Sequence, residues 1–162
     1  MAVPVIDATL SGAAANSYVT VAEAIAYFEL RPGGKLWVDL DAEQQRGSLQ
    51  FAATQIDREV YWGRKDAEAQ ALKFPRTGMT VIPEKVKHAQ IEQALHLANG
   101  GFQKQMEFID AQSSGVRESA AEGTRVRMVP FHSDTFASFQ LSTIARQLLS
   151  GFIEAGVQLG RA

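Results

Sequence analysis

The residues best suited to chemistry lie near the middle of the chain, where aromatic and basic side chains are mixed. They are Tyr61, Trp62, Arg64, Lys65 and the stretch KFPRTG, residues 73–78. Single-strand binders stack unpaired bases on aromatic rings and hold the phosphates with cations, so this mixture is compatible with nucleic-acid binding. Core packing of Trp62 and Phe74 beneath a long connector is the favoured alternative, because aromatic rings contribute much apolar area to protein cores.

The stretch KFPRTG also has the residues of a structural turn. Pro75 fixes its own backbone and keeps Phe74 extended, and Gly78 supplies a free turn. The guanidinium of Arg76 has enough donors for several carbonyls or for a carboxylate. The sequence therefore predicts a turn that anchors the connector to the core, with Phe74 pointing inward and Arg76 bonded to backbone or to a neighbouring subunit.

The sequence does not support a catalytic or metal site. His88 and His96 are eight residues apart, which is too far for ligands on adjacent helical turns. Asp57 and Glu59 point to different faces of a helix, and Ser150 lacks the flanking residues of a nucleophile elbow. The chain has no cysteine, which excludes a thiolate zinc site and a cysteine nucleophile. We therefore expect no enzymatic activity, no metal and no cofactor.

Positive charge is concentrated in one segment of an otherwise acidic chain. The 162 residues carry a net charge of −2, which argues against a dedicated nucleic-acid binder, but residues 61–88 hold six basic and three acidic side chains. Besides Arg76, the basic residues that could face DNA are Arg64, Lys65, Lys73, Lys85 and Lys87.

Length and composition indicate one globular domain, residues 1–162, that is mainly α-helical. We expect a small bundle of about four helices with an N-terminal arm, and a β-hairpin between the third and last helices. The expected segments are the arm 1–16, a helical core 17–110 with a connector 61–82, the hairpin 113–130 and a C-terminal helix 134–162.

The start MAVPVIDATL has no basic region, and nowhere do about 18 apolar residues follow one another. We therefore expect a soluble protein made in the cytosol, without a membrane partner.

Three helix starts are visible in the sequence. Thr20 with Glu23, and Asp41 with Gln44, each have the spacing of a capping box, and Pro83 is placed as a first-turn proline. The second of these helices is expected to run to about Tyr61.

The last helix, expected from about Phe136 to Val157, has an apolar stripe wider than one neighbouring helix requires. The residues chosen as candidates for contact with another protein chain are Leu148, Leu149, Phe152 and Ile153. Their alternative role is packing in the core of the same subunit.

Several motifs, in their order along the chain, carry a resemblance to a known family. They are ANSYVTVAEAIAYF (residues 15–28), Tyr-Trp-Gly-Arg (61–64), ALKFPRTG (71–78) and IPEKVKHAQIEQALHLA (82–98). The order resembles tailed-phage head-to-tail connector proteins, also called head-completion adaptors, some of which are labelled DnaT-like single-stranded DNA-binding proteins. The resemblance covers roughly residues 13–100.

The resemblance implies a structural protein of the virion without catalytic activity. Such a protein is assembled in the host cytoplasm and forms a ring of about twelve copies under the portal. The ring binds the portal and the next neck or tail-completion protein, and lets DNA pass without sequence-specific binding. The basic segment then either lines the DNA channel or, as we prefer, pairs with an acidic face of the neighbouring subunit around residues 39–43. The rival hypothesis is a phage single-stranded DNA-binding protein that acts in replication.

Overall fold

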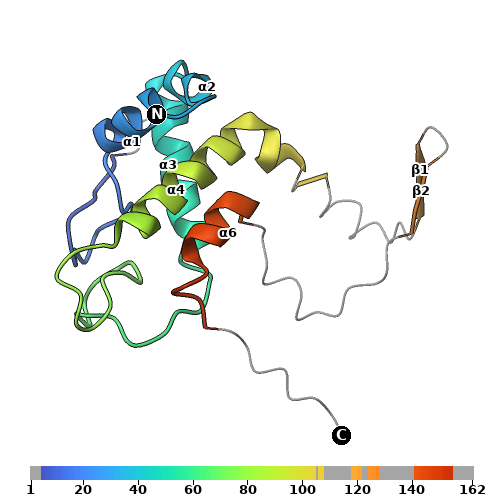
Figure 1. Ribbon diagram of the computed structural model, residues 1–162. Coiled ribbons are helices and arrows are strands. Elements are labelled where there is room, and N and C mark those ends of the chain that lie inside the picture. Colours follow the sequence, from blue (N-terminus) through green and yellow to red (C-terminus); the bar gives the residue numbers. More distant parts are fainter. Residues whose placement is uncertain (1–4, 105, 108–117, 122–123, 128–140, 155–162) are drawn as a thin grey trace, which may run out of the picture.

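The structure is a computed structural model, and it describes residues 5–104, 106–107, 118–121, 124–127 and 141–154. These residues form a mainly helical fold, as the sequence predicts (Figure 1). Within the described ranges, no helix combines the length and the apolar character needed to span a membrane.

Two capping boxes begin the N-terminal helices. Helix α1 (Val21–Glu29) starts after Thr20, whose side chain accepts from the backbone N–H of Glu23 while the Glu23 carboxylate accepts from that of Thr20. After the short helix α2 (Lys35–Val38), helix α3 (Ala42–Ile56) starts in the same way, from Asp41 and Gln44. Both helix starts predicted from the sequence are confirmed. Helix α3 is shorter than expected, because the chain turns at its end instead of continuing to Tyr61.

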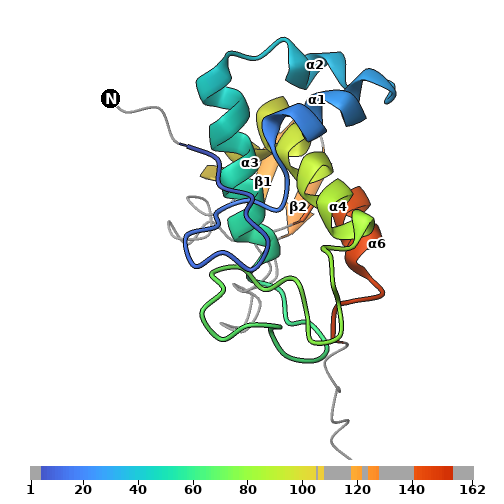
Figure 2. The same cartoon turned by 90° about the vertical axis from the view of Figure 1, so that its left-hand side faces the viewer.

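Helix α4 (Glu84–His96) is the central element and lies between α3 and α6 (Thr143–Leu149), as Figures 1 and 2 show. It follows Pro83, as expected, and continues into a π-type turn, η1 (Leu97–Gly101). Gly100 has a φ of +79° in this turn, a conformation that glycine adopts at little steric cost.

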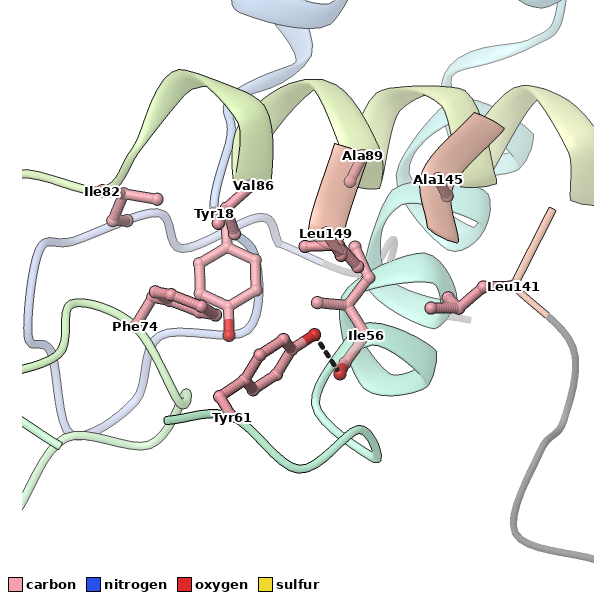
Figure 3. Close-up of a cluster of buried hydrophobic side chains, with 10 residues drawn as sticks. All are labelled: Tyr18, Ile56, Tyr61, Phe74, Ile82, Val86, Ala89, Leu141, Ala145 and Leu149. Atoms are coloured by element: carbon pink, nitrogen blue, oxygen red, sulfur yellow. Dashed lines mark hydrogen bonds between the residues drawn. The ribbon is translucent and has the colours of Figure 1, made fainter. Parts of the chain in front are cut away.

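The buried apolar side chains form two clusters, and α4 contributes to both. The first contains Tyr18, Ile56, Tyr61, Phe74, Ile82, Val86, Ala89, Leu141, Ala145 and Leu149 (Figure 3). The second contains Val19, Ala24, Phe28, Trp37, Leu49, Ala52, Ile91, Ala94, Leu95 and Leu97. Because α4 packs on two sides, polar residues of this helix are buried as well, and they need hydrogen-bond partners.

Gln90 and Gln93 of α4 connect segments that are distant in the sequence. The side chain of Gln90 accepts from the N–H of Tyr18 at 2.8 Å and donates to the Ser17 hydroxyl and to the carbonyl of Leu49. The side chain of Gln93 donates to Gln55 of α3 and accepts from the N–H of Ser142 at the start of α6, both at 2.6 Å.

Glu92 of α4, buried at 4% exposure, forms a third connection. Its two carboxylate oxygens accept from the guanidinium of Arg31, and one of them also accepts from the Tyr27 hydroxyl. Burial, together with the bond to Glu92, raises the pKa of Tyr27 to about 12. The ion pair holds the turn after α1 against the central helix.

The N-terminal arm expected over residues 1–16 is a closed loop where the structure describes it. The backbone N–H of Asp7 donates to the Asn16 side chain, and the N–H of Asn16 donates back to the Asp7 carbonyl. The loop is joined to the connector by a 3.0 Å bond from the N–H of Ala71 to the carbonyl of Gly12. The prediction of an extended arm was therefore wrong for residues 5–16, because asparagine and aspartate side chains bond local backbone and close loops.

Of the predicted C-terminal helix, 134–162, the structure describes residues 141–154, and α6 covers Thr143–Leu149 of these. Residues 134–140 and 155–162 lie outside the described residues, and the chain after Leu149 turns away from the helix. Phe152 and Ile153 then reach the first apolar cluster, and Ile153 lies opposite Tyr61 in an isolated antiparallel bridge. Their spacing fits a helical stripe, but a turn and a bridge bury these side chains against the same cluster.

Within the range predicted as a hairpin, 113–130, the structure describes two short antiparallel strands. They are β1 (Glu118–Ala121) and β2 (Thr124–Arg127), with Glu118 opposite Arg127. The rest of that range lies outside the described residues. The structure therefore supports the mainly helical class, whereas the hairpin over 113–130 stays a prediction.

Replacing Gln90 with Met should destabilise the fold, since the N–H of Tyr18 and the carbonyl of Leu49 would lose a buried partner. We expect the free energy of unfolding in urea to fall by about 2–4 kcal/mol. Gln147→Met on the exposed side of α6 is the matched control and should change it by less than about 0.5 kcal/mol. Equal stability of the Gln90 variant and the parent would show that the bonds of Gln90 do not stabilise the packing of α4.

Candidate nucleic-acid interface

The connector between α3 and α4 is an ordered loop arranged around Arg76. This side chain is 9% exposed, and its guanidinium donates to the carbonyls of Trp62 at 2.9 Å, Tyr61 at 2.8 Å and Lys73 at 3.3 Å, and to that of Gly63. Of the two arrangements that the sequence left open, Arg76 thus adopts the one with backbone partners of its own subunit.

Two lysines of the predicted basic segment also bind loop carbonyls. The ammonium of Lys65 donates to the carbonyls of Gln70 at 2.9 Å and Ala71 at 3.1 Å. The ammonium of Lys73 donates to the carbonyl of Glu59 at 2.6 Å and lies 5.9 Å from the centre of the Tyr61 ring. These charges stabilise the loop from within.

The remaining cations proposed to face DNA differ in their surroundings. Lys87 forms a 2.9 Å ion pair with Glu23 of α1. Arg64 and Lys85 are exposed, and neither side chain forms a hydrogen bond or ion pair within the part of the chain that the structure describes. The structure therefore leaves only part of the predicted basic segment open to a ligand.

Phe74 fills the space under the connector. It is 2% exposed, and the peptide bond that joins it to Pro75 is cis. Its ring packs edge-on against Tyr18, Tyr61 and Phe152. Figure 3 shows Phe74 beside Tyr18 and Tyr61. Gly78, which closes the turn, has a φ of +87°, in the left-handed region that glycine tolerates.

The Tyr18 hydroxyl joins the first sequence motif to KFPRTG through Asp57. It donates to one oxygen of the Asp57 carboxylate, and the other oxygen accepts from the N–H of Lys73 at 3.1 Å. Burial raises the pKa of Asp57 and that of Tyr18. Two of the motifs that carry the family resemblance are thus in direct contact.

Trp62 points outward and is 58% exposed, so the expectation that it packs in the core was wrong. Tyr61 before it is buried and donates its hydroxyl to the carbonyl of Ile56. Successive side chains of an extended segment point to opposite sides, so Trp62 lies on the same side as Val60, which is 60% exposed. The sequence signal that could have indicated this is the adjacent pair Tyr61-Trp62 in an extended segment.

The backbone beneath Trp62 is fixed from several directions. Its N–H donates to the carbonyl of Phe152 at 3.0 Å, and its carbonyl accepts from Arg76. The N–H of Glu154 donates to the carbonyl of Val60 at 2.8 Å, and that of Thr77 to the carbonyl of Arg64 at 2.9 Å. An exposed indole and a neighbouring cation are therefore carried by an immobilised segment.

The four residues proposed to contact a portal or a ring neighbour lie in or against the subunit core. Leu149 is fully buried in the first cluster, so it is not available to a partner. Leu148, Phe152 and Ile153 are partly buried against the same cluster. No group of histidine and acidic side chains that could hold a metal occurs among the described residues.

Replacing Arg76 with Ala should remove the bonds to the connector carbonyls and lower the free energy of unfolding by about 2–4 kcal/mol. Arg64→Ala, a charge removal at an exposed site of the same loop, is the matched control and should cost less than about 0.5 kcal/mol. Urea denaturation followed by circular dichroism measures both. An Arg76 variant that is as stable as the parent would mean that the connector is held without this side chain.

Comparison with known proteins gives one family. The family model described as "Putative DnaT-like ssDNA binding protein" matches residues 1–120, which include α1 to α4 and the connector. No curated protein and no solved structure matches the chain. Since the match covers well over half of the 162 residues, the chain belongs to this DnaT-like family.

Proposed function

We propose that the protein binds single-stranded DNA, with the indole of Trp62 as a stacking platform for an unpaired base. The observation that carries the proposal is a tryptophan 58% exposed on a backbone that is bonded on both sides. The description of the matched family supports the same ligand. This function is the rival hypothesis of the sequence analysis.

The geometry favours stacking because the platform is already ordered. A flexible aromatic side chain must lose backbone and side-chain freedom on binding, whereas the backbone of Trp62 is fixed before the ligand arrives. Stacking of one base on an aromatic ring contributes about 1–3 kcal/mol. Arg64, two residues further along the chain, is an exposed cation.

The two tryptophans make a direct test available. Trp37 is fully buried and donates its indole N–H to Ser48, so only Trp62 should respond to a ligand. An oligothymidylate of about 16 nucleotides should quench the intrinsic fluorescence of the parent, and Trp62→Ala should weaken binding about 5- to 150-fold. Fluorescence anisotropy of the labelled oligonucleotide measures the affinity.

Trp62→Phe is the control for this experiment, since it keeps an aromatic ring but leaves Trp37 as the only emitting indole. It should retain most of the affinity and lose the quenching. Unchanged affinity of the Trp62→Ala variant would place the binding surface elsewhere, and absence of binding by the parent would contradict the function.

A second candidate function is the structural adaptor of a tailed-phage virion. We propose it on the exposure of large apolar side chains outside the connector: Leu30 at 90%, Leu36 at 61% and Ile144 at 45%. A partner chain would remove this apolar surface from water. In this function the subunits form a ring of about twelve copies between the portal and the next neck or tail-completion protein, and DNA passes through without sequence-specific binding.

Assembly tests the adaptor directly. Light scattering after size-exclusion chromatography, and electron microscopy of the protein mixed with its portal, should show a ring or a portal complex. Leu30→Lys should abolish it, whereas Val81→Lys, also at an exposed apolar residue, should not. A protein that stays monomeric alone and with the portal would contradict this function.

A further inference from the structure

The charges around Trp62 limit how a DNA strand can be held there. Most cations near this residue in the sequence are bonded to backbone carbonyls. They are Lys65, Lys73 and Arg76. The residue that keeps an exposed, unbonded charge next to Trp62 along the chain is Arg64. A groove that follows a phosphate backbone needs a row of such charges, so this loop offers few cations for direct contact with phosphates.

Acidic side chains further reduce the attraction for phosphates. Asp66 and Glu68 are exposed and follow Arg64 within four residues. Glu154, also exposed, is joined through its backbone to Val60. These carboxylates offset part of the positive charge of the loop, and Arg64 is the cation there whose guanidinium is not already bonded to loop carbonyls.

Two exposed apolar side chains, Val60 at 60% and Trp62 at 58%, stand on alternate residues of this segment. Val60 and Trp62 project from the same side of the extended segment and lie about 6.5 Å apart along it. Such a strip suits the flat face of a base together with the apolar part of the adjacent nucleoside.

We infer that Trp62 and Val60 recognise the faces of unpaired bases, with about one phosphate contact per subunit, which Arg64 makes. This inference rests on the proposed single-stranded DNA binding and specifies its chemistry. The ligand class is a segment with accessible base faces. A duplex is excluded because its base faces are stacked on one another, and a strand without bases is excluded because it offers phosphates only.

The salt dependence of binding tests the inference. For a single strand, log K against log salt falls with a slope of about −0.7 for each phosphate that is neutralised. We expect a slope of about −0.7 for the parent and a slope near zero for Arg64→Ala. Lys85→Ala, which removes an exposed cation at the start of α4, is the matched control and should leave the slope unchanged.

An abasic oligonucleotide of the same length and charge provides the second measurement. The parent should bind it about 5- to 150-fold more weakly than oligothymidylate, and about as weakly as Trp62→Ala binds oligothymidylate. A slope of about −3 or steeper, or equal affinity for the abasic strand, would overturn the inference while single-stranded DNA binding stands. Failure of the parent to bind any oligonucleotide would instead overturn the proposed function itself.

Discussion

The burial of α4 on both sides is the constraint on which the rest of the structure depends. A helix between two apolar clusters cannot leave a polar side chain unpaired without a large free-energy cost. Gln90, Glu92 and Gln93 meet this requirement by bonding to other segments, and each selects a different one. The loop before α1, the turn after it, and the start of α6 are thereby held in place by about one turn of the same helix. Polar residues of α4 thus determine which segments pack together, and apolar residues supply most of the buried area.

In the connector, charged side chains are the hydrogen-bond partners of buried polar groups. Most of its carbonyls have no helix or sheet partner, and buried carbonyls need donors. Arg76, Lys65 and Lys73 provide these donors from within the loop. These bonds also affect the binding of nucleic acid, because a cation bonded to loop carbonyls is less available to a phosphate. A basic segment in a sequence can therefore indicate a loop whose cations donate hydrogen bonds to its own carbonyls as readily as a surface for nucleic acid.

Features that depend on residues three or four apart could be predicted from the sequence, and those that depend on distant pairing could not. The capping boxes at Thr20 and Asp41 are local, and both begin helices. The inward position of Phe74 followed from the turn around Pro75. The end of the last helix, however, is set by the pairing of Ile153 with Tyr61, some ninety residues earlier in the chain. No local sequence pattern indicates the pairing of Ile153 with Tyr61, and the helical spacing of the apolar residues predicted a longer helix instead.

The same bridge explains why Trp62 is exposed. Adjacent side chains of an extended segment point to opposite sides, so Tyr61 and Trp62 cannot both enter the first cluster. Tyr61 is the residue that fits, since its ring packs on Phe74 and its hydroxyl reaches the carbonyl of Ile56. The fold therefore requires a side chain on the outside at position 62, but nothing in the core specifies that it be aromatic. A small polar residue would satisfy the same backbone bonds with less apolar surface in water. The stability of the fold therefore gives no reason for an indole at position 62, whereas the proposed stacking on an unpaired base does.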